Sequence, residues 1–139
     1  MTNESLPWSS DRQRVSSGAP WEPRYGYARA VRVGPFVHVS GTTGVGADGK
    51  VVEGGMYAQA RRALDIIEGA LRETGATLAD VVRTRAYVTD VSRFDEVARA
   101  HGERFGDVRP AATLVQVTAL VDPLMLVEIE ADAIVDASR

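Results

Sequence analysis

The alternation of side chains in residues 124–135 constrains the fold more than any other feature of the sequence. Successive side chains of an extended strand point to opposite faces. The apolar face carries Met125, Val127, Ile129, Ala131, Ala133 and Val135. The opposite face carries Glu128, Glu130 and Asp132 among leucines. A strand with one dry face packs it against helices and leaves the other to solvent or a partner. We therefore place any chemistry on the face with Glu128; the alternative is a solvated or salt-bridged face.

Residues 110–120 have the composition of a further strand, and the turn Val121-Asp122-Pro123 follows them. Proline fixes its own φ and lacks an N–H group, so the strand must stop there. We expect the two final strands to pair as a hairpin.

The rest of the chain adds strands and two amphipathic helices. Apolar residues recur at three- and four-residue spacing in residues 55–74 and 92–105, which predicts helices, and Ser92 with Asp95 resembles a capping box. The expected order is β-β-β-α-β-α-β-β, an α+β fold with one mixed sheet covered on one face by two helices. Residues 1–24 form an N-terminal arm with an edge strand at 12–17, and residues 25–137 form a single domain. The remaining expected strands are 27–33, 36–40 and 80–90.

Composition excludes several classes of function. The 139 residues contain no cysteine and two histidines, so a thiolate metal site and a cysteine nucleophile are excluded. We expect no metal and no cofactor. A net charge of -3 disfavours a dedicated nucleic-acid binder. Without a long apolar run or a basic leader, we expect a cytoplasmic protein with no membrane partner.

Glu128 is the strongest catalytic candidate because it lies between hydrophobic neighbours in a strand. Burial would raise its pKa and suit it to general acid–base work or to positioning a water molecule. The alternative is an ion pair with Arg83 or Arg85. His38 and Ser40 do not form a hydrolase triad, since no G-x-S-x-G elbow is present.

Five segments of the chain have a recognisable pattern: residues 37–41, 58–64, 82–90, 110–111 and 126–131. Together these segments resemble the RidA/YjgF family, also described as L-PSP endoribonuclease. This resemblance implies a chorismate-mutase-like fold, assembled as a homotrimer with ligand clefts between subunits. It also implies the activity of the family's enzymes, which hydrolyse enamines and imines to carbonyl compounds and ammonia without a cofactor.

The resemblance assigns roles to individual residues. Glu128 matches the glutamate that orients the attacking water. Tyr27 matches a pocket tyrosine, and Ser40 with Gly41 matches a ligand-binding serine-glycine pair. The following Thr42 belongs to a glycine-rich loop whose backbone N–H groups suit a small polar ligand.

The sequence departs from the family at the substrate-binding arginine, which is Ala112 here. Leu114 replaces the usual cysteine, Ala98 replaces a pocket asparagine, and Thr113 helps to shape the cleft. A methyl group cannot replace a bidentate clamp on a carboxylate. Classical 2-imino acid deamination is therefore disfavoured. Accessory candidates are Arg109, upstream of the missing arginine, and His101, on the second helix.

Three functions follow from this sequence, in order of preference. The first is a homotrimer that hydrolyses enamines or imines less acidic than the family's usual substrates. The second is a non-catalytic trimer that binds a small ligand or stabilises proteins, favoured by Ala112, Ala98 and Leu114. The third is an endoribonuclease, for which the acidic chain offers no basic groove.

Overall fold

The computed structural model describes residues 11–136. Its helices and strands follow the expected order, with one additional short α-helix and two 3₁₀ helices (Leu78–Asp80 and Val91–Arg93). The strands are β1 (Gln13–Val15), β2 (Ala30–Val33), β3 (Phe36–Thr43), β4 (Val81–Val88), β5 (Ala111–Gln116) and β6 (Val127–Ile134). The helices are α1 (Trp21–Tyr25), α2 (Gly55–Glu73) and α3 (Phe94–Phe105).

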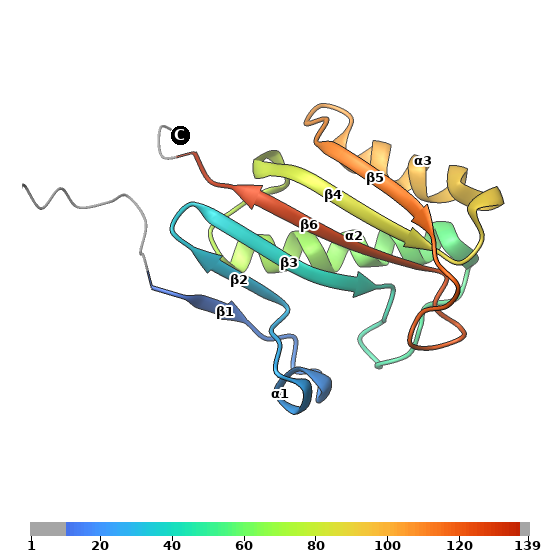
Figure 1. Cartoon of the computed structure of the whole chain (residues 1–139), viewed down its shortest axis with the longest axis horizontal. Helices are drawn as coiled ribbons and strands as arrows, with labels where there is room; N and C mark the ends of the chain where they lie inside the picture. Colours follow the sequence, from blue (N-terminus) through green and yellow to red (C-terminus); the bar gives the residue numbers. More distant parts are fainter. Residues whose placement is uncertain (1–10, 137–139) are drawn as a thin grey trace, which may run out of the picture.

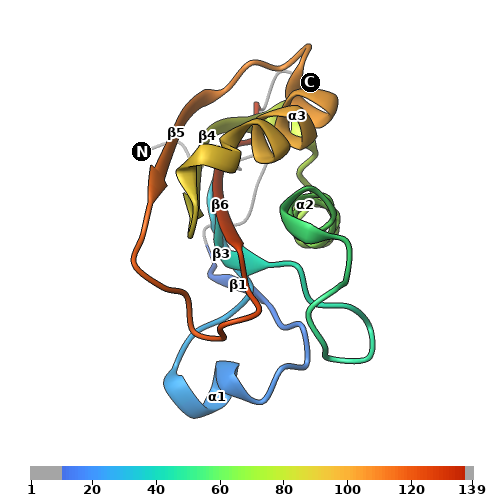
Figure 2. The same cartoon turned by 90° about the vertical axis from the view of Figure 1, so that its right-hand side faces the viewer.

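A single six-stranded sheet organises the molecule, with the strand order β1-β2-β3-β6-β4-β5 (Figure 1). The β4–β5 pair is parallel, and the other pairs are antiparallel. Both long helices lie on one side of the sheet, and the other side is open (Figure 2). This confirms the expected α+β class and the mixed sheet with one helix-covered face. We call the uncovered side the open face.

The apolar positions that predict the long helices form the core beneath them. In α2, Met56, Ala60, Leu64, Ile67 and Leu71 are all buried. The helix ends before Gly75, whose φ of 83° is left-handed and favours glycine. The sheet contributes Val127, Ile129, Ala131 and Ala133, which are fully or almost fully buried. The dry face of β6 is therefore the one expected from its alternation.

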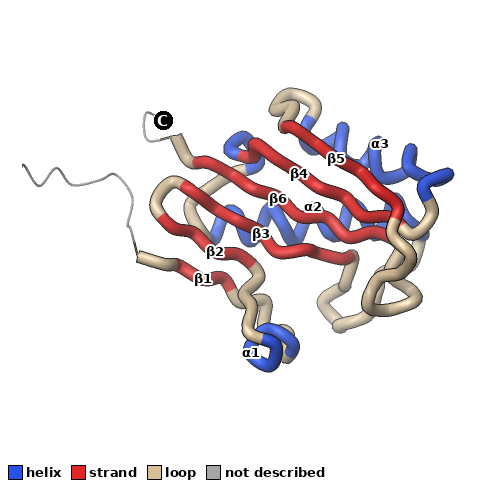
Figure 3. Tube along the Cα trace, in the orientation of Figure 1, coloured by secondary structure: helices blue, strands red, loops and turns tan. Residues whose placement is uncertain are grey.

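The expected hairpin of the last two strands is wrong. β5 pairs in parallel with β4 at one edge of the sheet, whereas β6 lies between β3 and β4. The reason is that β4, α3 and β5 form a crossover unit, which places the second strand beside and parallel to the first. Residues 117–126 form a long connection rather than a tight turn (Figure 3).

The buried side chain of Gln59 fixes that long connection to α2. Its amide nitrogen donates to the carbonyl of Leu124 at 3.0 Å, and its amide oxygen accepts from the backbone N–H of Leu126 at 2.8 Å. The glutamine thus satisfies two backbone groups of an irregular segment. This contact fixes the chain just before it enters β6.

Two local expectations fail near the second helix. Ser92 does not cap α3: Asp90 accepts hydrogen bonds from the backbone N–H (3.0 Å) and hydroxyl (2.6 Å) of Ser92. A carboxylate two residues upstream is the stronger acceptor. The apolar stripe of α3 is also shifted from the one that the spacing predicts, which is Phe94, Val97, Ala98, His101 and Phe105. Phe94 and Ala98 are exposed, whereas Ala100 is buried.

A third correction concerns the start of β4. The alternation in residues 80–90 predicts Val82 on the dry face with Thr84, Ala86 and Val88. In the structure Val82 is 44% exposed, whereas Val81 is buried. The pairing with β6 shifts register between Val81 and Arg83. Such an irregularity exchanges the faces of the residues that precede it.

Among residues 11–136, no helix combines the length and the apolar character needed to cross a membrane.

Candidate functional site

A bulge in β3 shapes the backbone beside Glu128. Val39 pairs with Ala131 and Thr42 pairs with Ile129, so Ser40 and Gly41 together face Glu130. The Ser40 hydroxyl donates to the carbonyl of Ala28 at 2.6 Å. A bulge of this kind bends the strand and redirects its groups, which is common beside functional sites.

Thr42 lies on the helix side of the same strand. Its side chain is buried, and its hydroxyl donates to the carbonyl of Ser40 at 2.7 Å. The hydroxyl is therefore committed to the bulge, and its side chain does not line the open face with Glu128.

Glu128 packs directly against Gly41. A methyl group on Gly41 would lie 3.0 Å from the carboxyl carbon of Glu128 and 3.1 Å from its Oε1 atom. The carboxylate is half-buried and has no hydrogen bond or ion pair to the residues in the described range. Burial raises the pKa of Glu128; the charge of Arg29 opposes this effect, and Glu130 adds to it.

Arg29 lies beside Gly41 and Glu128, but it is not among the site residues predicted from the sequence. Its Nη2 atom donates to the carbonyl of Gly41 at 2.6 Å, and its guanidinium carbon lies 5.9 Å from the ring centroid of Tyr27. The signal that could have identified it is its two-residue spacing from Tyr27 in an expected strand. We call Tyr27, Arg29, Ser40, Gly41 and Glu128 the Glu128 cluster.

A second feature is a pocket of about 280 Å³ between α3 and the β4–β5 pair. Ala112 and Leu114 pair with Thr84 and Ala86, whose side chains are buried on the helix side. We call this cavity the α3–β5 pocket. It is lined by Thr84, Ala86, Val97, Ala98, His101, Gly102, Ala112, Thr113 and Leu114.

His101 provides the imidazole of this largely apolar pocket. Its Nε2 atom shares a 2.8 Å hydrogen bond with the Thr84 hydroxyl, and its ring centroid lies 4.7 Å from that of Phe105. Burial lowers the pKa of His101, so the neutral imidazole is favoured. The pocket thus offers a ligand the hydrogen-bonded His101–Thr84 pair and no charged side chain.

The candidate site residues therefore divide between two places. The Glu128 cluster borders the open face, whereas Ala112, Leu114 and His101 lie on the helix side. Within one chain, the sheet separates these groups. Arg109 is exposed, has a φ of 53° and does not line the pocket.

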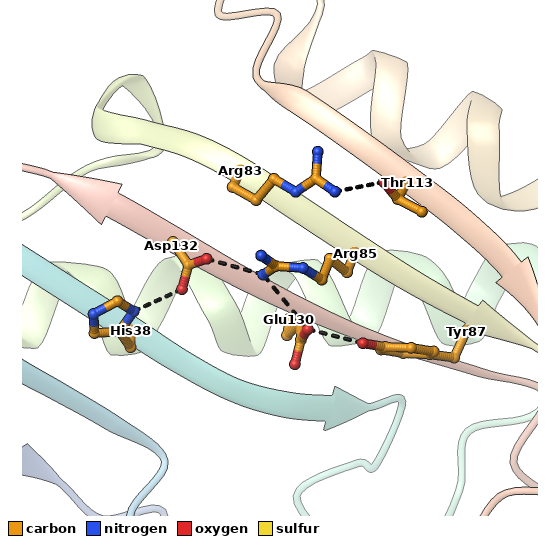
Figure 4. Close-up of polar contacts among 7 residues, drawn as sticks. All are labelled: His38, Arg83, Arg85, Tyr87, Thr113, Glu130 and Asp132. Carbon is orange, nitrogen blue, oxygen red and sulfur yellow. Dashed lines mark hydrogen bonds and ion pairs between the residues drawn. The ribbon is translucent and has the colours of Figure 1, made fainter.

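Charged side chains near Glu128 on the open face are paired with one another (Figure 4). His38 Nδ1 and Arg85 Nη1 donate to the two oxygens of Asp132 at 2.7 and 3.0 Å. Tyr87 donates to Glu130 at 2.9 Å. The structure does not support the alternative ion pair of Glu128, because Arg85 bonds Asp132 and Arg83 donates to Thr113 at 2.6 Å.

Asp132 differs electrostatically from Glu128. Partial burial acts to raise the pKa of Asp132, but the hydrogen bonds from His38 and Arg85 outweigh burial and lower it overall. The two ends of β6 thus place carboxylates in opposite environments. In residues 11–136, no three histidine or acidic side chains come together in a geometry that could hold a metal ion.

The chain is similar to known proteins over most of its length. The family model described as Endoribonuclease L-PSP matches residues 18–135. The chain belongs to this family, RidA/YjgF. Rv2704 of Mycobacterium tuberculosis, a member of the YjgF/YER057c/UK114 family, is 56% identical and superposes with a TM-score of 0.82. That match covers 90% of this chain and 100% of Rv2704.

Two further proteins are similar to this chain over most of their own length. The protein SCO2049 of Streptomyces coelicolor is 39% identical over 96% of this chain and 95% of its own. RidA from an Antarctic Psychrobacter is 28% identical with a TM-score of 0.77, covering 88% of this chain and 94% of that one. These likenesses confirm the fold and the family membership inferred from the sequence.

Proposed function

We propose that this protein hydrolyses small, uncharged imines or enamines to carbonyl compounds and ammonia. The observation that supports this most is the Glu128 carboxylate, which is half-buried, packed on Gly41 and unpaired in the described range. A carboxylate held in this way is poised to accept a proton rather than to stabilise the fold.

The proposed reaction needs water and one general base. Glu128 accepts a proton as the water oxygen attacks the imine carbon, and the C=N electron pair moves to nitrogen. The proton then returns to the nitrogen, which gives the neutral carbinolamine. Glu128 next takes the proton of the carbinolamine hydroxyl and passes it to the amino group, so that the C–N bond breaks and ammonia leaves as the C=O bond forms. An enamine enters the same sequence after protonation at carbon. No redox step is involved.

The α3–β5 pocket supports an uncharged substrate. Ala112 offers no charge to a substrate carboxylate, and the imidazole of His101 is favoured in its neutral form. The apolar lining suits a small hydrocarbon group, while the His101–Thr84 pair suits one polar atom. The family's usual acidic substrates would leave a carboxylate without a cation here.

We further propose that the site is shared between copies of a homotrimer. Glu128 and the α3–β5 pocket lie on opposite faces of the sheet, so one small ligand can contact both only if they come from different copies. The edge strand β5 carries one wall of the pocket and lies at a margin of the sheet where another copy can approach. A closed ring gives every copy the same contact.

Ammonia release from an uncharged imine tests the chemistry. Glu128→Gln keeps the size of the side chain and removes the base, so we expect a loss of about 100-fold or more in the turnover number. Asp132→Asn is the matched control on the same strand, and its activity should stay within about threefold of wild type. Equal rates in wild type and Glu128→Gln would exclude this role.

Subunit mixing tests the shared site. Glu128→Gln removes the base, and Ala112→Trp fills the pocket, so each variant alone should be inactive. If every site combines two copies, co-expressed random mixtures regain about a quarter of wild-type activity. If each site belongs to one chain, mixtures remain inactive.

The second candidate function is ligand binding without turnover, which the largely apolar α3–β5 pocket favours. In that case uncharged analogues raise the melting temperature while ammonia release stays at the background rate. Filling the pocket by Ala112→Trp should abolish the thermal shift, and Glu128→Gln should leave it intact. Turnover that depends on Glu128 would exclude this second function.

A further inference from the structure

Arg29 and Glu128 approach the same peptide from two directions. The Arg29 guanidinium donates to the carbonyl oxygen of Gly41 at 2.6 Å. The Glu128 carboxyl group packs so closely against that glycine that a Cβ atom there would lie 3.0 Å from the carboxyl carbon. The bulge of β3 thereby connects a cation to a carboxylate that has no direct partner in the described range.

The rest of the Arg29 side chain is also held. Its guanidinium lies beside the Tyr27 ring, and its buried Nε atom makes no hydrogen bond within the described residues. Its backbone N–H donates to the carbonyl of Val15 at 2.7 Å. The arginine is thus fixed by β1 on one side and by the bulge on the other.

We propose that Arg29 is a positioning residue for the water-activating group: it fixes the Gly41 peptide on which Glu128 packs and keeps the Glu128 side chain in its carboxylate form. The functional meaning of this role rests on the proposed hydrolysis. Arg29 does not need to contact the substrate in this role. A carboxylate must be unprotonated to accept a proton from water, so this cation keeps the base competent.

The charged groups around Glu128 favour this assignment. Glu130, two residues along β6, disfavours the ionised form, and Tyr87, its pairing partner on β4, is neutral and bonded to Glu130. The neighbouring residues Ser40, Gly41 and Thr43 of β3 carry no charge. Arg29, just ahead of β2, is the group that lowers the pKa of Glu128 against burial and Glu130.

A carboxyl titration tests the proposal without requiring turnover. In the assembled protein labelled with ¹³C-glutamate, Arg29→Gln should move the Glu128 titration to higher pH. Arg29→Lys, which retains the charge, should restore most of the wild-type position. Arg32→Gln is the matched control, because Arg32 donates to the carbonyls of Gly34 and Thr74 instead. An unchanged Glu128 titration in Arg29→Gln would overturn the proposal, as would an equal shift in Arg29→Lys.

A wild-type measurement covers the case in which Arg29→Gln does not fold. The ¹⁵Nε resonance of Arg29 should shift with the same midpoint as the Glu128 carboxyl, whereas that of Arg32 should not. No movement of the Arg29 resonance would contradict the coupling. Where turnover is measurable, the acid limb of its pH profile should move with the Glu128 titration in Arg29→Gln. A shifted titration without ammonia release in any variant would refute the proposed hydrolysis and leave the Arg29–Glu128 coupling established.

Discussion

The two ends of β6 hold carboxylates on the same face in opposite ways. Asp132 is bonded to His38 and Arg85, and these contacts lower its pKa. Glu128 is half-buried against Gly41, and burial raises its pKa. One acid is stabilised in its charged form by partners, and the other is held without them. A strand can thus carry a structural and a chemically poised carboxylate four residues apart.

The difference arises from β3 rather than from β6. His38 stands opposite Asp132 in regular pairing, so it reaches the carboxylate directly. Beyond Val39 the bulge intervenes and places Gly41 where a side chain would meet Glu128. A local change in β3 therefore contributes to the opposite directions in which the pKa values of Asp132 and Glu128 are displaced.

Among changes that test the difference between Glu128 and Asp132, Gly41→Ala should have the largest effect. The new methyl group would lie 3.0 Å from the carboxyl carbon of Glu128, so the acid must give way by a few tenths of an ångström. Because a displacement of about 1 Å in a catalytic group can lower the rate about 100-fold, we expect this smaller shift to lower ammonia release by more than about 10-fold. Gly69→Ala is the control, since a methyl group there meets nothing within 4 Å. Wild-type activity in Gly41→Ala would show that the Glu128–Gly41 contact is unimportant.

A smaller effect is expected from restoring the missing cation with Ala112→Arg. A guanidinium in the α3–β5 pocket should improve pyruvate binding by about 10-fold or more, the usual contribution of a hydrogen bond between charged groups. Pyruvamide has nearly the same shape without the charge, so its affinity should not improve in parallel. Calorimetric titration of both ligands measures the difference. Equal gains for the two ligands would indicate a change in pocket shape instead of charge recognition.

Alternation and helical spacing sufficed to predict the layers of this fold. The dry face of β6 follows from Val127, Ile129, Ala131 and Ala133, because period-two burial depends only on the strand itself. The partner of that strand could not be predicted in the same way. Strand order depends on the crossover through α3, and a nearby proline turn gave the wrong hairpin.

The candidate site was predicted only in part for a related reason. Glu128 and the serine-glycine pair are recognisable from local sequence, and the structure brings them together at the bulge. Arg29 was missed because its importance comes from a carbonyl 12 residues away, which no periodicity reveals. The separation of Ala112 from Glu128 by the sheet was also hidden, since it depends on the register of β5 against β4.

The smallest expected effects are on the free energy of unfolding. At neutral pH, replacing Asp132 should lower this free energy, whereas replacing Glu128 should raise it. The folded-state pKa of Asp132 is below its ordinary value of 3.8, so its contribution is present above that pH and is lost as the pH falls through the folded value. Asp132→Asn should therefore lower the free energy of unfolding by about 1 kcal/mol at neutral pH, a modest figure for partly exposed charged bonds. The deficit should shrink in strong acid.

Glu128 should show the opposite dependence of stability on pH. Its folded-state pKa lies above the ordinary 4.5, so the ionised form destabilises the fold above the folded value, and the penalty disappears as the pH falls below 4.5. Glu128→Gln should thus be more stable than wild type at neutral pH and lose that advantage in acid. Urea unfolding across this pH range, at one protein concentration because assembly contributes to stability, measures both differences. Destabilisation by Glu128→Gln at neutral pH would mean that Glu128, like Asp132, is held by partners in the assembled protein.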